Sequence, residues 1–178
     1  MFFRTITDEI QLGILTVQNA QELFSLIDAS RGYLRQWLPW VDGTKSPDDS
    51  REFIERSLHQ FSSNNGFQAG IWYKAQIVGV IGFHAMDWNN RRTSIGYWLG
   101  EQFQGRGIMT TACRAMVDIA FREYKLNRVE IRAAVENTKS RAIPERLGFL
   151  KEGVCRQAEW LYDHFVDHVI YSMLSEDW

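Results

Sequence analysis

Hydrophobic positions recur along this chain at two spacings, which predict strands and helices in alternation. Two-residue alternation and short apolar runs indicate seven strands, at residues 9–16, 67–73, 76–85, 93–99, 128–135, about 149–157 and 165–174. Spacings of three and four predict four helices, at residues 19–30, 47–63, 110–124 and about 141–147. Hairpins come early, and one strand–helix–strand crossover spans residues 93–135. This order predicts an α/β fold (an α+β mixed sheet) rather than a doubly wound Rossmann domain.

Local signals fix several of the expected boundaries. Ser46 is an N-cap candidate, and Pro47 occupies the first helical position behind it. A tight connection is expected at Lys74-Ala75, between two strands. Proline costs little in the first turn of a helix, so Pro144 predicts that the last helix begins near Ile143. No repeat or linker divides the chain, and we expect one domain over residues 1–178.

Composition excludes several classes of protein. The 178 residues are 45% hydrophobic and 24% charged, which is typical of a globular protein. The net charge of −2 argues against a nucleic-acid partner, because such proteins carry excess Lys and Arg. No run of 18 apolar residues spans a membrane, and the N-terminus lacks the apolar run of a signal peptide. Two cysteines provide no disulfide framework. We therefore expect a cytoplasmic protein.

The segment Gln104-Gly105-Arg106-Gly107-Ile108-Met109 lies between a predicted strand and a predicted helix. Two glycines one residue apart allow a tight turn and a close approach of the backbone to a ligand. The amides at the following helix N-terminus favour an anion, and Arg106 adds a positive charge. These properties predict a pyrophosphate site, although ordinary turn glycines would leave the same pattern. Thr110 replaces the third glycine of a Rossmann fingerprint, and no P-loop Gly-Lys-Ser/Thr is present.

A second informative segment runs from Asn137 to Phe149. Asn137 or Ser140 can cap a helix, and Gly148 suits the position just beyond its C-terminus. A cap and a stop alone would also explain these residues. The compound pattern is more specific: Gln-x-x-Gly-x is followed some thirty residues later by Asn-x-x-Ser and then by Glu-x-x-Gly-Phe.

This compound pattern resembles the GNAT superfamily of acetyl-CoA-dependent N-acetyltransferases over roughly residues 93–155. The stretches FQGRGIMTTA, SRAIPERLGF and YLRQWLPW are similar to the Rim type, the bacterial ribosomal-protein N-terminal acetyltransferases, and QAEWL is similar to the serine-specific member. Two positions depart from the superfamily pattern. Met109 stands where Gly or Ala is usual, and no Tyr follows Asn137 at the common general-acid position.

The resemblance implies the GNAT-like acyl-CoA N-acyltransferase fold, whose two central parallel strands splay apart, here residues 93–99 and 128–135. It also implies that acetyl-CoA is the co-substrate and that its pantetheine arm pairs with the backbone at the splay. The implied pantetheine-binding residues are Trp98, Leu99 and Gly100. The implied pyrophosphate-binding residues are Gln104, Gly105, Arg106, Gly107, Ile108 and Met109. Asn137, Ser140 and Arg141 are expected along the other side of the cofactor.

The resemblance further implies direct attack of an amine on the thioester. By similarity, Glu159 is the general base and Ser140 is the hydrogen-bond donor to the departing sulfur. The alternatives without a catalytic role are a surface carboxylate for Glu159 and a helix cap for Ser140. If Glu159 is not the base, Asp87, Glu101 or a water held by backbone carbonyls would have to serve.

Other reactive residues have plainer interpretations. Cys113 falls on the apolar face of its predicted helix, which is typical of a structural cysteine. His164 and His168, beside acidic residues, match no known ligand spacing, so we expect no metal. His84 lies within the predicted hydrophobic strand 76–85 and is interpreted as a hydrogen-bonded core residue.

The leading hypothesis is an N-terminal acetyltransferase acting on a ribosomal protein. A small amine acceptor, such as a polyamine, an amino sugar or an antibiotic, is the main alternative. A polycation would require clustered carboxylates, and Asp42, Asp87 and Glu101 are scattered in the sequence. A non-catalytic acetyl-CoA sensor is the third hypothesis. The 13% aromatic content and a C-terminal edge strand are compatible with a homodimer.

Overall fold

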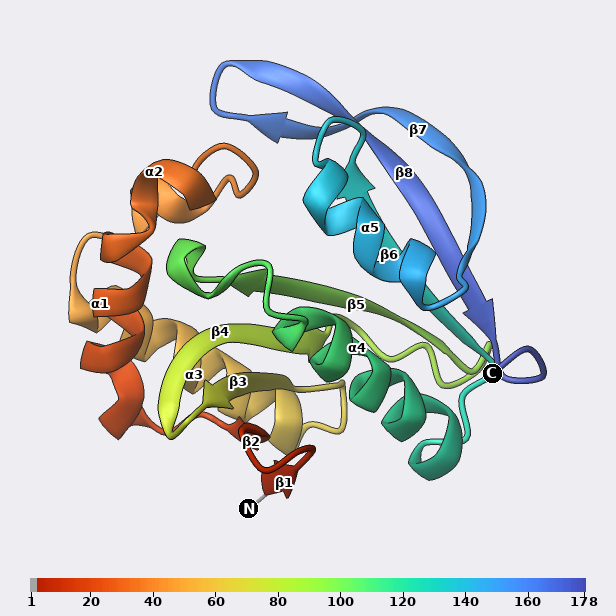
Figure 1. The fold of residues 1–178 in the computed structure, drawn as a ribbon, viewed down its shortest axis with the longest axis horizontal. Coiled ribbons are helices and arrows are strands. Elements are labelled where there is room, and N and C mark those ends of the chain that lie inside the picture. Colours follow the sequence, from red (N-terminus) through yellow and green to blue (C-terminus); the bar gives the residue numbers. More distant parts are fainter. Residues whose placement is uncertain (1–2) are drawn as a thin grey trace.

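A computed structural model describes residues 3–178, and its strands form one sheet (Figure 1). Eight strands lie in the order β1-β2-β3-β4-β5-β6-β8-β7. Their bounds are β1 Phe3–Thr5, β2 Ile10–Ile14, β3 Gln68–Tyr73, β4 Gln76–Phe83, β5 Arg92–Leu99, β6 Arg128–Ala134, β7 Leu150–Leu161 and β8 His164–Leu174. The seven predicted strands are present, and β1 is an additional short edge strand.

The two central strands, β5 and β6, form the parallel pair of this otherwise antiparallel sheet. Their pairing runs from Arg92 opposite Arg128 to Ile95 opposite Ile131 and then stops. Beyond Ile95 the strands diverge, as the ribbon shows (Figure 1). The parallel crossover expected from the sequence is therefore confirmed. The divergence of β5 and β6 divides the sheet into two arms.

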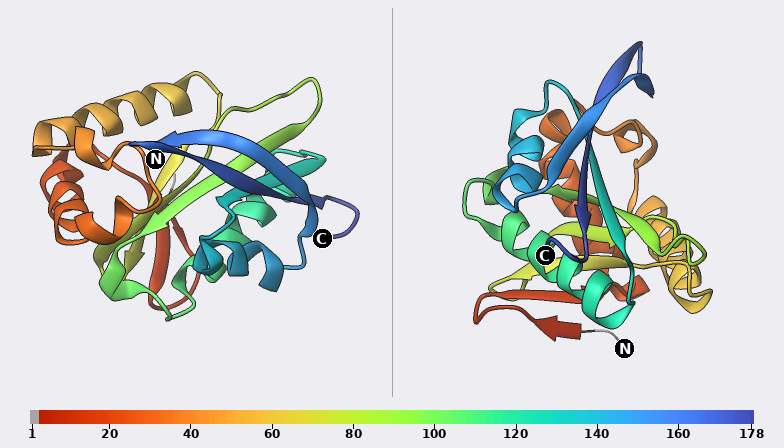
Figure 2. Two further views of the ribbon diagram at one scale, coloured as in Figure 1. Left: turned by 90° about the horizontal axis from the view of Figure 1, so that it is seen from above. Right: turned by 90° about the vertical axis from the view of Figure 1, so that its right-hand side faces the viewer.

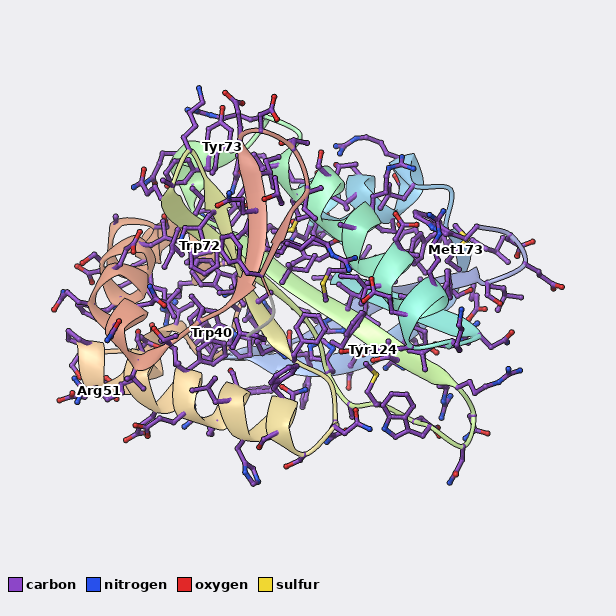
Figure 3. All side chains as sticks on the ribbon, turned by 90° about the horizontal axis from the view of Figure 1, so that it is seen from below. Trp40, Arg51, Trp72, Tyr73, Tyr124 and Met173 are labelled. Atoms are coloured by element: carbon purple, nitrogen blue, oxygen red, sulfur yellow. The ribbon has the colours of Figure 1, made fainter. Side chains whose placement is uncertain are left out.

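Helices cover both faces of the sheet (Figure 2). The bounds are α1 Ala20–Ala29, α2 Arg31–Leu34, α3 Pro47–Ser62, α4 Ile108–Asp118, a π-helical turn Ile119–Glu123 and α5 Thr138–Arg146. Helices α1 and α3 lie on one face, and α4 and α5 lie on the other. Side chains fill the space between these layers (Figure 3). In residues 3–178, no helix combines the length and the hydrophobicity needed to cross a bilayer.

The boundaries with strong local signals are where the sequence predicts them. The backbone N–H of Ser46 donates to the Asp49 carboxylate at 2.8 Å, which completes a capping box ahead of Pro47. Lys74 and Ala75 have φ angles of 51° and 65°, as a two-residue hairpin between β3 and β4 requires.

Helix α5 begins five residues earlier than the position of Pro144 predicts. It starts at Thr138, Asn137 is its N-cap, and Pro144 lies inside it. Pro144 has no N–H to donate to the carbonyl of Ser140, four residues back. The hydroxyl of Tyr97 donates to that carbonyl instead, at 3.0 Å. A partner from β5 thus compensates for the missing helical hydrogen bond, and no local signal in the sequence reveals it.

Glu152, on β7, should make stability depend on acidic pH. Arg128 donates to both of its carboxylate oxygens, at 2.7 and 2.6 Å, and Ser172 donates to one of them. The Arg128 hydrogen bonds, followed by that of Ser172, lower the pKa of Glu152 to about 2 from an ordinary 4.5. A lowered pKa stabilises the fold above the unfolded-state value, and this contribution is lost as pH falls from about 4.5 to about 2.

Urea unfolding of the wild type and of Glu152→Gln at pH 7 and near pH 2.5 tests this prediction. The difference in unfolding free energy should be larger at pH 7 and should shrink at the lower pH. Glu55→Gln, on the exposed face of α3, is the matched control and should show no such change. An equal Glu152→Gln difference at both pH values would contradict the assignment.

Candidate active site

Unpaired backbone groups face the gap between β5 and β6. The amide of Gly100 donates to the carbonyl of Val78 on β4 at 2.8 Å, so in this antiparallel pair the even-numbered residues of β5 bond to β4. The backbone groups of Tyr97 and Leu99 therefore point the other way, into the gap. Buried polar backbone groups need partners, and an amide-containing ligand chain such as pantetheine supplies them.

This register corrects two of the expected pantetheine-binding residues. The Gly100 amide is already bonded, and the register places Trp98 as the hydrogen-bonded partner of Val80. Tyr97, which was not expected from the sequence, faces the gap together with Leu99, so the backbone groups of these two residues are the ones available to a pantetheine arm. The two-residue period of the strand could have indicated this, because it places Tyr97 and Leu99 on the same side.

The glycine segment forms an anion-binding turn at the N-terminus of α4. Gly105 and Gly107 have φ angles of 72° and 73°, which disfavour other residues, and an added Cβ at either would meet no protein atom within 4 Å. The first helical hydrogen bond runs from Thr111 to Gly107, so the amides of Ile108 and Met109 have no helical acceptor. The Met109 side chain is 7% exposed and belongs to the hydrophobic core, which accounts for a large residue at this position.

Three cations surround this turn. Arg106 lies within it, while Lys139 and Arg146 reach it from α5: Lys139 donates to Gln104 and Arg146 to Thr110. All three cationic residues line one cavity of about 740 Å³ together with the glycine segment. The turn, the helix N-terminus and the cations together suit the phosphates of coenzyme A. Lys139 and Arg146 are additional to the sequence prediction, because their proximity to the turn depends on the packing of α5 against α4.

A second cavity of about 920 Å³ opens on the other side of the gap. It is bounded by α1, α3, the segment after α2, the even-numbered face of β5, and the ends of β6, β7 and β8. The two cavities meet at six shared residues: Trp37, Leu38, Tyr97, Trp98, Asn137 and Ser140. A ligand in the first cavity and a second molecule in the other would therefore meet among these shared residues, which include Ser140.

Ser140 is held in the first turn of α5. Its amide donates to the side chain of Asn137 at 3.2 Å, so Asn137 is the cap and Ser140 is not. The Ser140 hydroxyl lies 3.5 Å from the Tyr97 hydroxyl. Burial raises the pKa of Tyr97 far above its usual value, so its hydroxyl keeps its proton. The amides of Ser140 and Arg141 both bond to Asn137, so neither is free to bind a ligand.

If Ser140 donates to the departing sulfur, as the resemblance implies, Ser140→Ala should lower kcat by roughly 10²-fold with little change in acetyl-CoA affinity, because the hydroxyl would then act mainly on the developing thiolate. Unfolding free energy should stay near that of the wild type, since the cap is intact. Asn137→Ala, by comparison, should cost about 1 kcal/mol of stability. Steady-state kinetics and urea unfolding of both variants test this. Wild-type kcat in Ser140→Ala would remove the serine from the reaction.

Glu159 lies in the second cavity, on a distorted stretch of β7. The pairing with β8 shifts between Cys155 and Glu159, and the amide of Gln157 (φ 49°) donates to the carboxylate of Asp167 at 2.7 Å. Bulges of this kind redirect the side chains that follow them. His168 lies 3.4 Å from the Glu159 carboxylate and lines the same cavity. Glu159 is therefore a wall residue of the cavity rather than an isolated surface carboxylate.

Two further expectations need correction. Arg141 lines neither cavity: its guanidinium donates to the Val135 carbonyl and to the Tyr171 hydroxyl, at 2.7 and 3.0 Å. It is therefore held by Val135 and by Tyr171 of β8, outside the lining of both cavities. His84 is hydrogen-bonded to Ser94 at 2.9 Å, but it is an exposed residue of the second cavity and not a core residue.

Cys113 is fully buried, and burial raises the pKa of its thiol to about 12. Such a thiol is not a nucleophile at neutral pH. Within residues 3–178, no group of three or more His, Cys, Asp or Glu residues could hold a metal ion. Ser140 and Glu159, to which the resemblance assigns the acid and base roles, both line these cavities.

A splayed parallel pair beside a phosphate-binding turn, with an acceptor cavity on the opposite side, defines an acyl-CoA-dependent transferase. The GNAT acetyltransferase domain matches residues 11–150. The chain belongs to this family and is an acetyl-CoA-dependent N-acetyltransferase.

Two curated relatives and two solved structures cover nearly the whole chain. YdaF of Bacillus subtilis (strain 168), named as a candidate ribosomal N-acetyltransferase, is 40% identical over 100% of this chain and 98% of that protein. The ribosomal-protein-serine acetyltransferase of Escherichia coli (strain K12) is 30% identical over 96% of each. RimL, a ribosomal L7/L12 α-N-protein acetyltransferase solved with coenzyme A, superimposes with a TM-score of 0.93 at 26% identity, covering 97% of this chain and 98% of that one. The microcin C7 self-immunity acetyltransferase MccE, solved with acetyl-CoA and AMP, gives 0.92 at 34% identity, covering 95% and 94%.

Proposed function

We propose that this protein acetylates the N-terminal α-amine of a ribosomal protein. The observation that carries the proposal is the meeting of the two cavities at Ser140, with Glu159 in the wall of the acceptor side. The similarity to a ribosomal-protein-serine acetyltransferase and to RimL supports the choice of acceptor.

Three groups of the protein each have one role in the acetyl transfer. The Leu99 amide, which faces the gap, donates a hydrogen bond to the thioester carbonyl oxygen and stabilises the charge that develops there. Glu159 takes a proton from the incoming ammonium, directly or through a water molecule, and the neutral amine then attacks the thioester carbon. The C–N bond forms as the C–S bond breaks, the Ser140 hydroxyl donates a hydrogen bond to the departing sulfur, and the proton that the new amide nitrogen loses ends on the thiolate. A thioester is already activated, so no enzyme nucleophile is required.

The acidity of the ammonium group favours an α-amine over a lysine as the acceptor. An α-amine titrates near pH 8 and a lysine side chain near 10.4, so only about 0.1% of lysine is neutral at pH 7.5. Proton transfer to a carboxylate is unfavourable from either ammonium, but the α-ammonium is more acidic than the lysine ammonium by about 2.5 pH units, so lysine is the much poorer acceptor.

A panel of acceptors tests this function. The protein is incubated with acetyl-CoA and a Ser-initiated peptide, the same peptide with a blocked N-terminus, or a polyamine, and thiol release is measured. Release with the free peptide alone supports the proposal, whereas release with the polyamine alone contradicts it. Coenzyme A binding without release on any acceptor would favour a sensor.

A small-molecule amine is the second candidate acceptor. MccE is 34% identical to this chain and was solved with a nucleotide as well as acetyl-CoA. The acceptor cavity here contains Trp40, Phe53 and Trp98, which offer flat apolar surfaces. An aminoacyl nucleotide carries an α-amine, so the same base would serve it, and adding such a compound to the panel separates the two candidates.

The proposal extends to the cellular location of the enzyme and to its oligomeric state. A ribosomal-protein acceptor implies a cytoplasmic enzyme, and we retain the homodimer as a hypothesis. Its support is the apolar surface along β7 and β8, where Leu150, Val154, Trp160 and Phe165 are between 48% and 68% exposed. Sedimentation at a mass of 20.8 kDa would contradict a dimer.

A further inference from the structure

We propose that Tyr162 is a positioning residue that joins the β7–β8 hairpin to the segment after α2 and so sets the shape of the acceptor cavity. The inference rests on the proposed function, because Glu159 lies on this hairpin three residues before Tyr162. Trp37 and Leu38, which lie at the junction of the two cavities, are on the joined segment.

The backbone at Tyr162 is strained. Strand β7 ends at Leu161 and β8 begins at His164, so Tyr162 and Asp163 form the two-residue turn. Tyr162 has a φ angle of 60°, a conformation that glycine and asparagine adopt readily in such turns and bulky residues adopt at a cost. Within residues 3–178 it is the one aromatic residue with positive φ. Strain of this kind persists where the surrounding contacts hold it.

Two contacts hold the Tyr162 side chain, and both come from the segment after α2. Its hydroxyl donates to the carbonyl of Leu38 at 2.6 Å, across 124 residues of sequence. The guanidinium of Arg35 lies 3.9 Å from the centre of its ring and is fixed by Asp42, at 2.9 Å. Burial, followed by the charge of Asp42, raises the pKa of Tyr162, so the hydroxyl remains a donor at neutral pH.

These contacts connect two walls of the acceptor cavity: the β7–β8 hairpin, which carries Glu159, and the segment after α2, which carries Leu38. Figure 1 shows the far end of the hairpin extending past the main sheet toward α2. On the segment side, Trp40 packs against Trp98 of β5, with ring centres 5.9 Å apart. A shift of the hairpin would therefore move Glu159 relative to Trp37 and Leu38 without disturbing the phosphate turn at the other end of the first cavity.

Hydrogen exchange in Tyr162→Phe and Tyr162→Asn tests the connection itself. Phenylalanine loses the hydrogen bond to Leu38 and keeps the ring over Arg35, whereas asparagine loses both contacts and relieves the backbone. Exchange in residues 35–43 and 157–166 should rise by about two- to tenfold in Tyr162→Phe, the range that one net hydrogen bond provides, and further in Tyr162→Asn. Ala75→Gly is the matched control, since Ala75 has a φ of 65° in the β3–β4 turn. It should leave both segments unchanged.

Kinetics separate positioning from a merely structural role. In both Tyr162 variants, KM for a Ser-initiated peptide should rise at least fivefold, while acetyl-CoA affinity stays within twofold and Tm changes little. Unchanged exchange in residues 35–43, or unchanged KM in an active enzyme, would overturn the inference. If the wild type acetylates no peptide, the proposed acceptor is wrong. In that case hydrogen exchange alone tests whether Tyr162 joins the two segments: faster exchange in residues 35–43 and 157–166 supports the connection, and unchanged exchange overturns it.

Discussion

Glu159→Gln is expected to lower kcat at neutral pH by roughly 10²-fold, the usual contribution of a positioned general base. Glutamine preserves the shape of the side chain and an oxygen acceptor, so it can keep the contact that Glu159 makes with the His168 ring. The variant loses only the capacity to accept the ammonium proton. Raising the pH should restore much of the rate, because solution then supplies neutral α-amine, and the wild type should gain less over the same range.

Two other outcomes would assign Glu159 differently. If it only attracts a cationic N-terminus, KM rises, kcat holds, and added salt removes the difference from wild type. If kcat, KM and the pH profile are all unchanged, Glu159 takes no part in the reaction. Asp163→Asn is a matched control, since that carboxylate is 88% exposed on the same hairpin, and its rate should stay near that of the wild type.

Gly107→Val is expected to weaken coenzyme A binding by more than tenfold. Its φ of 73° is unfavourable for a β-branched residue, so the backbone should turn away from the geometry that aims the α4 amides at phosphate. The added side chain would also project into space that the protein leaves open around the turn. Isothermal titration calorimetry with coenzyme A gives the affinity directly.

Gly148→Val controls for the loss of stability. Gly148 has a φ of 81°, lies just beyond α5, and lines neither cavity. Both variants should lose about 1–2 kcal/mol of folding free energy through the same kind of backbone strain. Only Gly107→Val should lose affinity. An affinity within twofold of the wild type would show that the turn does not bind the pyrophosphate.

The sequence was sufficient where short-range chemistry decides the structure. Ser46 and Pro47 define a helix start by capping alone, and Gly105 and Gly107 define a turn because few other residues adopt their φ angles. Alternation of apolar residues over 128–135 predicts a strand with one buried face, which β6 has. Each of these features depends on residues only a few positions apart.

The sequence was insufficient where a residue far away in the chain determines a helix boundary or the direction of a side chain. The rule that proline begins a helix misplaces α5, because Tyr97 satisfies the carbonyl that Pro144 leaves unpaired. Arg141 lies in a motif segment, but Tyr171 and Val135 hold its guanidinium away from the cavities. The direction of Glu159 depends on a bulge that Asp167 stabilises from the next strand.

Transfer of the acetyl group to an N-terminal α-amine rather than to a lysine can be tested with one peptide that carries both kinds of amine. A peptide that begins with serine and contains one internal lysine is incubated with acetyl-CoA and the wild-type protein, and the product is fragmented in a mass spectrometer. We expect one acetyl group on the serine α-amine, with the lysine unmodified. An acetyl group on the lysine, or an unmodified peptide under conditions where coenzyme A binds, would contradict this expectation.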